Sequence, residues 1–170
     1  MATDPRDARL SEIAHAFWER YLRTLPANHS HRGTRPDVFA FGDSPSLADE
    51  LAALVQTGRK RATASLPIEF TSEGLPPPAP GDISIVTRAD GTPVAIIELT
   101  EVRHVAFHAV DAAFAGDEGE GDGTLAWWQA AHRRYFGRVC ARAGVRFDDA
   151  ALVICRRFRL LSSANTSTPA

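Results

Sequence analysis

The sequence is almost free of lysine. Of its nineteen basic residues, one is a lysine, Lys60, and eighteen are arginines. Arginine stays protonated and forms a rigid planar fork, whereas a desolvated lysine can lose its proton and act as a base or a nucleophile. A chain that uses arginine almost everywhere else therefore marks this amine as a candidate for catalysis. The alternative interpretation is a chance surface lysine or a cation at the end of a helix.

Cysteine, long apolar runs and excess charge are also scarce. Cys140 and Cys155 lack metal-ligand spacing, so we expect two reduced core thiols in a cytoplasmic protein. No apolar run approaches the roughly 20 residues that span a bilayer, and residues 1–7 lack the apolar core of a signal peptide. We therefore expect no membrane partner. A net charge of −2 argues against coating nucleic acid by bulk electrostatics, but not against recognition of a single nucleoside.

Apolar periodicity and turn residues predict an α+β chain. The strands are separated irregularly, which favours a small β-barrel with helices packed around it over a doubly wound sheet. We divide the chain into a helical extension (1–37), a main domain (38–161) and a disordered tail (162–170). The predicted helices are 8–25, a segment from Ser46 with Asp49 in a capping box, 110–115 and 124–143. The predicted strands are 38–41, 61–66, 83–87, 94–105 and 151–161, and the proline-rich stretch 67–80 is predicted to be an irregular loop.

The lysine lies where a helix is predicted to give way to a strand. Gly58 suits a left-handed helix terminus, Lys60 lies on the turn, and strand alternation places Thr63 and Ser65 on one face. This arrangement makes Thr63 a candidate nucleophile or water-orienting hydroxyl beside the amine.

A second polar segment is the acidic loop 116–123, which precedes the predicted helix 124–143. The loop contains Glu118, Glu120 and Asp122 among glycines. Its plainest interpretation is a solvated loop in which Asp122 or Thr124 caps the helix. The spacing fails the EF-hand pattern, so we expect no metal site.

The predicted helix 124–143 carries Leu125, Trp128, His132 and Phe136 on one stripe. This pattern favours a hydrogen-bonded core histidine over a catalytic one. Of the adjacent Trp127 and Trp128, one is expected in the core, while the other could stack on a nucleobase.

Three phrases in this order resemble the ASCH domain family. They are Phe41-Gly-Asp-Ser-Pro-Ser-Leu-Ala-Asp-Glu50, Gly58-Arg-Lys-Arg-Ala-Thr-Ala-Ser65 and Glu118-Gly-Glu-Gly-Asp-Gly-Thr-Leu-Ala-Trp-Trp128. The resemblance implies a β-barrel related to the PUA RNA-binding fold. Relatives include amidohydrolases that remove the acetyl group from the exocyclic amine of N-acetylated cytidine. Other relatives are ribonucleases or RNA-binding modules, which is the alternative function.

The resemblance also implies a set of site residues. The Lys-x-x-Thr motif of the amidohydrolases matches Lys60 and Thr63. Their catalytic glutamate aligns with Glu120 after a one-residue shift, and Glu118 is its rival. Together with the reading of the residues themselves, the resemblance leads us to expect substrate binding by Arg59, Arg61, Ser65, Glu118, Asp122, Thr124 and Trp128. No cofactor is implied, and the expected partner is a nucleoside or RNA.

Amide hydrolysis requires a nucleophile, a base, an acid for the leaving amine and donors for the oxyanion. In one scheme a neutral Lys60 takes the proton of Thr63 and Glu120 serves the leaving nitrogen. In the other, Lys60 and Glu120 act on a water that Thr63 orients. Burial lowers the pKa of a lysine and a nearby carboxylate raises it, so the sequence leaves the charge of Lys60 open.

Overall fold

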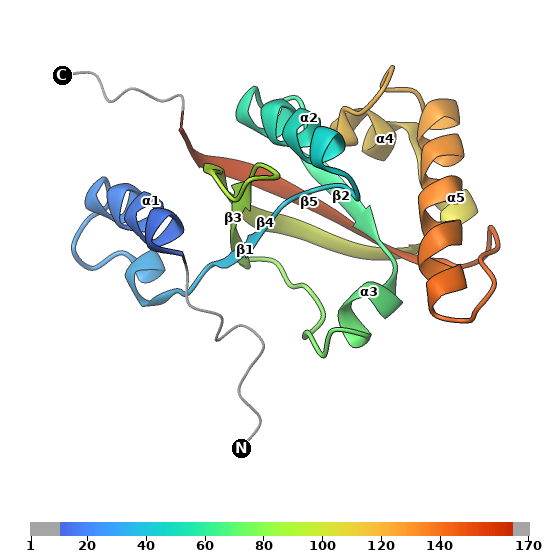
Figure 1. Ribbon diagram of the computed structural model, residues 1–170, viewed down its shortest axis with the longest axis horizontal. Helices are drawn as coiled ribbons and strands as arrows, with labels where there is room; N and C mark the ends of the chain where they lie inside the picture. The colour runs from blue at the N-terminus through green and yellow to red at the C-terminus, as the bar shows by residue number, and fades with distance from the viewer. Residues whose placement is uncertain (1–10, 165–170) are drawn as a thin grey trace. The chain divides into compact units, whose positions relative to one another are not determined.

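The computed structural model describes residues 11–164 of the 170-residue chain (Figure 1). The helices are α1 (Glu12–Arg23), α2 (Pro45–Gln56), α3 (Pro67–Thr71), α4 (Ala112–Glu118) and α5 (Leu125–Arg142), with 3₁₀ turns η2 (Ser30–Gly33) and η3 (Phe107–Ala109). The strands are β1 (Asp37–Phe39), β2 (Ala62–Ser65), β3 (Ile83–Thr87), β4 (Pro93–Ala106) and β5 (Leu152–Ser163). The α+β class is therefore confirmed.

The strands form one mixed sheet in the order β1-β3-β4-β5-β2. β1 pairs with β3 in parallel, while β3–β4 and β2–β5 are antiparallel. Within residues 11–164 no ladder joins the edge strands β1 and β2, so the predicted closed barrel is wrong. The edge strands are three and four residues long, which leaves few backbone groups for closure.

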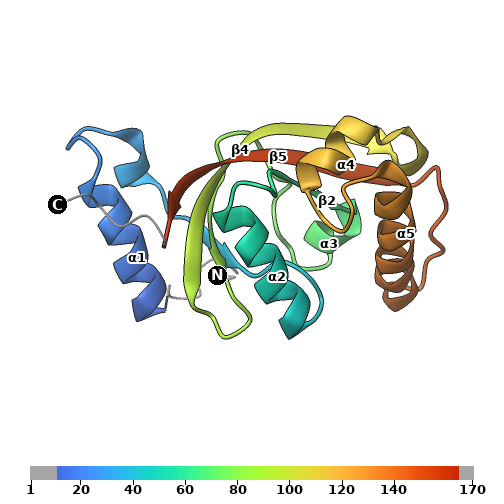
Figure 2. The same ribbon diagram turned by 90° about the horizontal axis from the view of Figure 1, so that it is seen from above.

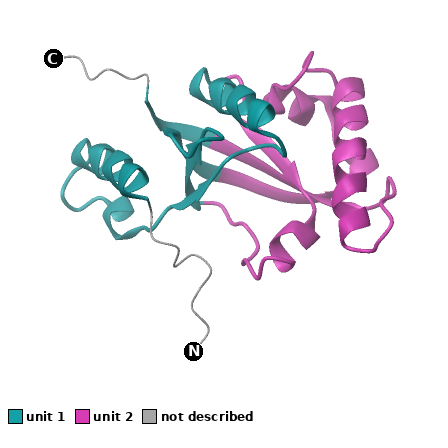
Figure 3. Ribbon diagram, in the orientation of Figure 1, with its two compact units in different colours: residues 1–58, 81–99, 159–170 teal, residues 59–80, 100–158 magenta. Residues whose placement is uncertain are grey.

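The chain divides into two compact units (Figure 3). Unit 1 comprises residues 1–58, 81–99 and 159–170, and unit 2 comprises residues 59–80 and 100–158. In unit 1, apolar side chains of α1 pack on β3 and β4, with Phe17 and Trp18 against Ile85 and Ile96. The N-terminal helix thus shares a core with the sheet strands of its own unit. The domain boundaries suggested by the sequence stay predictions.

Unit 2 has its own core, built where α4 and α5 pack beside each other and α4 contacts β2 (Figure 2). Trp128 and Phe136 of α5 pack with Phe114 of α4 and with Ala62 and Ala64 of β2. The two alanines are small, so α4 can approach the strand closely. Unit 2 also carries the lysine turn and the acidic loop.

Several local predictions need correction. Ser44 caps α2 instead of Ser46: its side chain accepts from the backbone N–H of Leu47, and Pro45 fills the first helical turn. Asp49 instead accepts from the N–H of Ala89, 2.9 Å away. The stretch after Leu66 begins with helix α3, because Pro67 occupies the first turn, where its missing N–H costs nothing.

The ends of the chain are covered in part. Residues 8–10 of the first predicted helix and residues 165–170 of the predicted tail lie outside the described residues, while Ser162 and Ser163 belong to β5. Among residues 11–164, none of the helices is long and apolar enough to cross a membrane.

Candidate functional site

Lys60 lies on the turn that leads from α2 to β2. The helix ends at Gln56 and Gly58 takes a φ of 72°, the left-handed conformation predicted for it. The chain then enters β2 at Ala62. The Lys60 side chain points into the protein and is 1% exposed. A lysine buried this deeply needs charged partners.

The partners come from the acidic loop, whose glycines fix the position of Glu120. Gly119 and Gly121 have φ values of 66° and 53°. A Cβ on Gly119 would lie 2.5 Å from the carbonyl oxygen of Arg59, and one on Gly121 would lie 2.1 Å from the ring of Trp127. Both positions therefore require glycine for conformation and for space. The backbone is therefore closely packed on both sides of Glu120, against Arg59 at Gly119 and against Trp127 at Gly121.

The acidic loop is tied to the lysine turn along its length. The backbone N–H of Arg61 donates to the carbonyl of Asp117 at 2.7 Å, and its guanidinium donates to the Asp117 carboxylate at 2.7 Å. At the other end, Arg59 donates to the carbonyl of Gly121 at 3.0 Å. These contacts bracket Lys60 and hold both glutamates beside it.

The ammonium of Lys60 contacts both rival glutamates. Its Nζ donates to Glu118 Oε2 at 3.0 Å and to Glu120 Oε1 at 2.5 Å. The Glu118 side chain is 1% exposed and that of Glu120 is 14% exposed. Two carboxylates therefore share one cation, and Glu120 is the member of the cluster most open to solvent.

The three groups shift one another's pKa values. Burial lowers the pKa of Lys60, but the charges and hydrogen bonds of Glu118 and Glu120 outweigh it and raise the pKa above its ordinary value. Burial raises the pKa of Glu118, yet Lys60, His132 and the Trp128 N–H bring it below its ordinary value. Burial, aided by the charge of Glu118, keeps the pKa of Glu120 above its ordinary value despite Lys60. Lys60 is therefore a cation here, and Glu120 is the carboxylate that gains and loses a proton most readily.

Glu118 is held from behind by α5. Its Oε1 accepts from Nε1 of Trp128 at 3.0 Å and lies 3.5 Å from Nε2 of His132. Trp128 is itself 1% exposed, so its indole serves the core and Glu118 together. His132 is buried and hydrogen-bonded, as its place on the helical stripe predicted, but its contact with Glu118 was not predicted. The spacing of Trp128 and His132, four residues apart on one helix, was the available signal.

Thr63 and Ser65 face away from the side of β2 that carries Ala62 and Ala64. Thr63 pairs with Arg156 of β5, and the Ser65 hydroxyl accepts from the Arg156 guanidinium at 2.6 Å. That guanidinium also lies 5.2 Å from the ring centre of Phe70. Within the described residues, no hydrogen bond joins the Lys60 ammonium to the Thr63 hydroxyl. The contact of Arg156 with Ser65 was not predicted, because the residues of β2 and β5 do not by themselves determine how the two strands are aligned.

The remaining predicted substrate-binding residues have local structural contacts. Asp122 accepts from the backbone N–H and the hydroxyl of Thr124 at 2.9 and 2.7 Å. The Thr124 hydroxyl in turn accepts from the N–H of Trp127 and caps α5, as predicted for one of these two residues. Among residues 11–164, no group of three His, Cys, Asp or Glu side chains is arranged to hold a metal ion.

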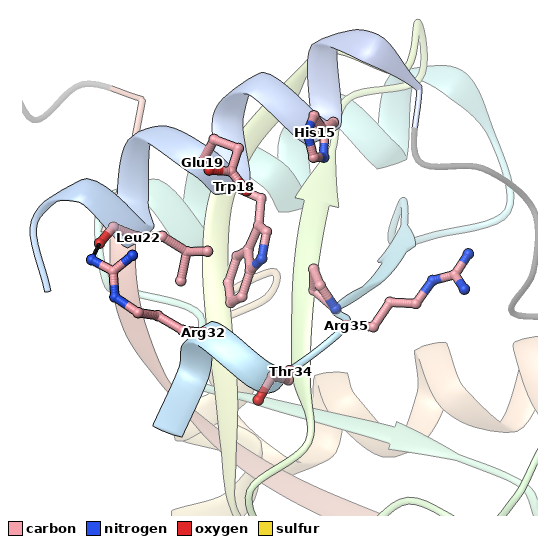
Figure 4. A pocket seen from close by; sticks show the side chains of 8 residues that line it. His15, Trp18, Glu19, Leu22, Arg32, Thr34 and Arg35 are labelled. Atoms are coloured by element: carbon pink, nitrogen blue, oxygen red, sulfur yellow. Dashed lines mark hydrogen bonds between the residues drawn. The ribbon is translucent and has the colours of Figure 1, made fainter. Parts of the chain in front are cut away.

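Unit 1 contains a separate open hollow of about 470 Å³ beside α1 (Figure 4). Trp18 and Leu22 of the helix line it together with the segment that carries Thr34 and Arg35. Arg32 also lines it, but its guanidinium donates to the carbonyls of Leu22, Leu25 and Pro26 and so closes the end of α1. This hollow has an aromatic wall but lacks the ionic cluster of unit 2.

Comparisons with known proteins bear on the site. The ASCH domain family model matches residues 37–162. An ASCH domain from Lactobacillus crispatus JV V101 is 34% identical, with a TM-score of 0.85 over 92% of this chain and 98% of that one. A protein from Enterococcus faecalis V583 is 28% identical, with a TM-score of 0.75 over 93% of this chain and 98% of that one. Both solved structures cover more of the chain than residues 37–162, so the similarity includes part of the N-terminal segment. No curated protein sequence matches significantly.

Proposed function

The chain belongs to the ASCH domain family, and we propose that it is an amidohydrolase that removes an acyl group from the exocyclic amine of an N-acylated cytidine or a related nucleoside. The observation that carries the proposal is the Lys60–Glu118–Glu120 cluster. Two neighbouring carboxylates with opposite pKa shifts flank one buried cation. When the pKa values of two neighbouring carboxylates are shifted in opposite directions, the one with the lowered pKa, here Glu118, stays charged, and the one with the raised pKa, here Glu120, can transfer protons.

Glu120 is the proton-transfer residue in this proposal. Its pKa is raised and its side chain is partly exposed, so it suits a general base that later acts as an acid. Glu120 takes a proton from the attacking water as the water oxygen bonds to the amide carbon. The tetrahedral intermediate then collapses, the C–N bond breaks, and the leaving nitrogen receives the proton from Glu120. The products are the carboxylic acid and the free nucleoside amine.

Lys60 acts as a cation in this scheme. Because Glu118 and Glu120 raise its pKa, the resting amine is charged and does not accept the proton of Thr63. It keeps Glu120 in place and limits the rise of its pKa. A charged Lys60 favours the scheme in which water is the nucleophile and Thr63 orients it, over the scheme in which the Thr63 hydroxyl attacks and forms an ester.

A test of the water scheme lies in two Thr63 variants. Thr63→Ala should retain measurable turnover, because one positioning hydrogen bond contributes a few kcal/mol at most. Thr63→Ser should lie close to the wild type. Complete loss in Thr63→Ala with activity in Thr63→Ser, together with an acyl group trapped on the peptide 61–66, would instead establish Thr63 as the nucleophile.

The decisive experiment is incubation with N4-acetylcytidine, with release of cytidine followed by chromatography. Glu120→Gln should reduce kcat about 10²–10⁴-fold, the usual contribution of a general acid-base residue. Glu98→Gln is the matched control, because the Glu98 side chain is 16% exposed, close to the 14% of Glu120, and is paired with Arg159. Absence of cytidine release by the folded wild type with several acyl groups would refute the proposed activity.

RNA binding or cleavage at the same site is the alternative function. It is favoured by Arg59 and Arg61, two exposed cations that flank Lys60 in the sequence and suit phosphate contacts. RNA binding should weaken steeply with salt, whereas nucleoside hydrolysis should change little. Strand cleavage of an oligonucleotide without release of cytidine would select this alternative.

A further inference from the structure

The Glu118 carboxylate has two sides, and His132 lies on the side opposite to Lys60. Lys60 binds Oε2, while the Trp128 N–H and His132 Nε2 approach Oε1. Glu118 is therefore enclosed by donors of two elements, the lysine turn and α5. The charged groups around His132 are Glu118 at the end of α4 and, beyond it, Lys60 and Glu120.

The proton positions on the His132 ring follow from its neighbours. Nδ1 lies 3.0 Å from the backbone carbonyl oxygen of Trp128, which can only accept, so Nδ1 carries a proton. In a neutral ring, Nε2 would then turn a lone pair toward the Glu118 carboxylate. A second proton replaces this repulsion with an attraction between opposite charges 3.5 Å apart.

Packing prevents the ring from turning away. His132 is 8% exposed and stacks on the indole of Trp128 at 4.1 Å with an interplanar angle of 17°. The centre of the Phe136 ring, one helical turn further along α5, lies 5.4 Å from the centre of the His132 ring. Because the ring position is fixed, protonation changes the charge beside Glu118 without a change of geometry.

We propose that His132 is a positioning residue of this site, whose protonated Nε2 holds Glu118 from behind and so reduces the negative charge that Glu120 experiences. The inference rests on the proposed function for its kinetic consequence, but not for its structural part. A charged His132 lowers the pKa of both Glu118 and Glu120. The Glu120 base should therefore stay ionised to lower pH when His132 is present.

The structural part is tested by NMR of the histidine ring nitrogens at about pH 6. The wild type should show His132 with both nitrogens protonated and a slowly exchanging Nε2–H. In Glu118→Gln that proton should exchange rapidly. His108 is the matched control, because its Nδ1 also contacts a backbone carbonyl, that of Asp149 at 2.8 Å, but its side chain is exposed. An unprotonated or rapidly exchanging Nε2 in the wild type would overturn the inference, whether or not the protein hydrolyses acylcytidine.

The kinetic part is tested by the pH dependence of cytidine release. His132→Phe keeps the stacking ring but removes the charge, so the acid limb of kcat should move to higher pH with KM nearly unchanged. His132→Gln keeps a neutral donor and should show the same shift, which separates charge from hydrogen bonding and from misfolding. His108→Phe should leave the profile in place. An unshifted acid limb in both His132 variants would refute the positioning role.

Discussion

Two neighbouring residues at the end of α4 belong to two different ionic networks. Asp117 faces outward and accepts from Arg61 and Arg157, while Glu118 faces inward and accepts from Lys60. The outer network continues from Arg157 to Glu101, and its side chains are 24–64% exposed. The inner network includes two side chains at 1% exposure. One residue step along the helix thus separates surface charges from buried ones.

The difference shows what each network contributes. In the outer network water screens the charges, and arginines can exchange partners with little loss. In the inner network each charge depends on the others, because the side chains of Lys60 and Glu118 are shielded from solvent and an uncompensated buried ion is costly. Burial raises the pKa of both Glu118 and Glu120, but the contacts of Glu118 with Lys60, His132 and Trp128 bring its pKa below the ordinary value, so the two pKa values move apart. Function is therefore expected where the structure is least tolerant of charge removal.

The strongest test of this contrast is Lys60→Met, which removes the shared cation. Two carboxylates then remain in a buried site without their partner, so the free energy of unfolding should fall by about 3–5 kcal/mol. Urea denaturation at neutral pH measures this loss. Activity should also disappear.

The double variant Lys60→Met, Glu118→Gln serves as the control for charge. It removes the more deeply buried carboxylate together with the cation, and the raised pKa of Glu120 allows that residue to take up a proton. Stability should recover in large part, although activity should not. A Lys60→Met protein as stable as the wild type would show that the inner network behaves like the outer one.

A second prediction concerns the glycines that hold Glu120. Gly119→Ala adds a Cβ that would lie 2.5 Å from the Arg59 carbonyl oxygen, in addition to the unfavourable φ. Gly123→Ala meets a similar φ of 76° but has no atom within 4 Å of the added Cβ. Gly123→Ala should therefore cost only the conformational energy, roughly 1–2 kcal/mol. Gly119→Ala should cost more and should also reduce kcat, because Glu120 moves away from Lys60. Equal losses of stability and of kcat in both variants would show that the close contact does not position Glu120.

A third prediction uses pH to separate the two glutamates. In the proposed mechanism Glu120 acts as an ionised base, so activity should be lost as the pH falls through its raised pKa. Glu118→Gln removes the like charge that contributes to this rise, and the acid limb of kcat/KM should move to lower pH. A loss of kcat as large as that expected for Glu120→Gln would mean that Glu118 and Glu120 have exchanged roles.

Stability should respond in a characteristic way in the same variant. The folded pKa of Glu118 is depressed, so its contribution is present above its ordinary pKa of about 4.3 and is lost as the pH falls through the folded value. Glu118→Gln lacks this contribution at neutral pH. Its free energy of unfolding should therefore fall less on acidification than that of the wild type.

The local parts of this architecture could be predicted from the sequence. Periodicity placed β3 correctly and α5 to within a residue, and Gly58 marked the end of α2. Lys60 stood out because its chemical alternative, arginine, is used everywhere else. Each of these signals lies within a few residues of the feature that it indicates.

The pairings that make the site are long-range, and local signals do not contain them. Lys60 meets Glu118 and Glu120 across 58 and 60 residues of chain. Glu118 and Glu120 were alternatives for one position in the sequence, but both contact the lysine. The prediction of a closed barrel was wrong for a similar reason, because the residue pattern within each strand does not show whether the edge strands β1 and β2 pair with each other. The charge of Lys60 depended on burial and on both partners at once, so it also required the structure.

The smallest expected effect belongs to the outer network. Arg61→Ala removes one of two guanidinium groups from Asp117, but Arg157 still donates to Asp117 Oδ2 at 2.8 Å. The backbone N–H of Arg61 also keeps its bond to the Asp117 carbonyl. The Arg61 side chain is 64% exposed, so its loss should cost about 0.2–1 kcal/mol at low salt and less at high salt, where exposed charges are screened. Urea denaturation at two ionic strengths measures both values. A loss as large as that of Lys60→Met, unchanged by salt, would show that the two networks act as one unit through α4. A small, salt-sensitive loss leaves Asp117 as a surface tether and Glu118 as part of the site.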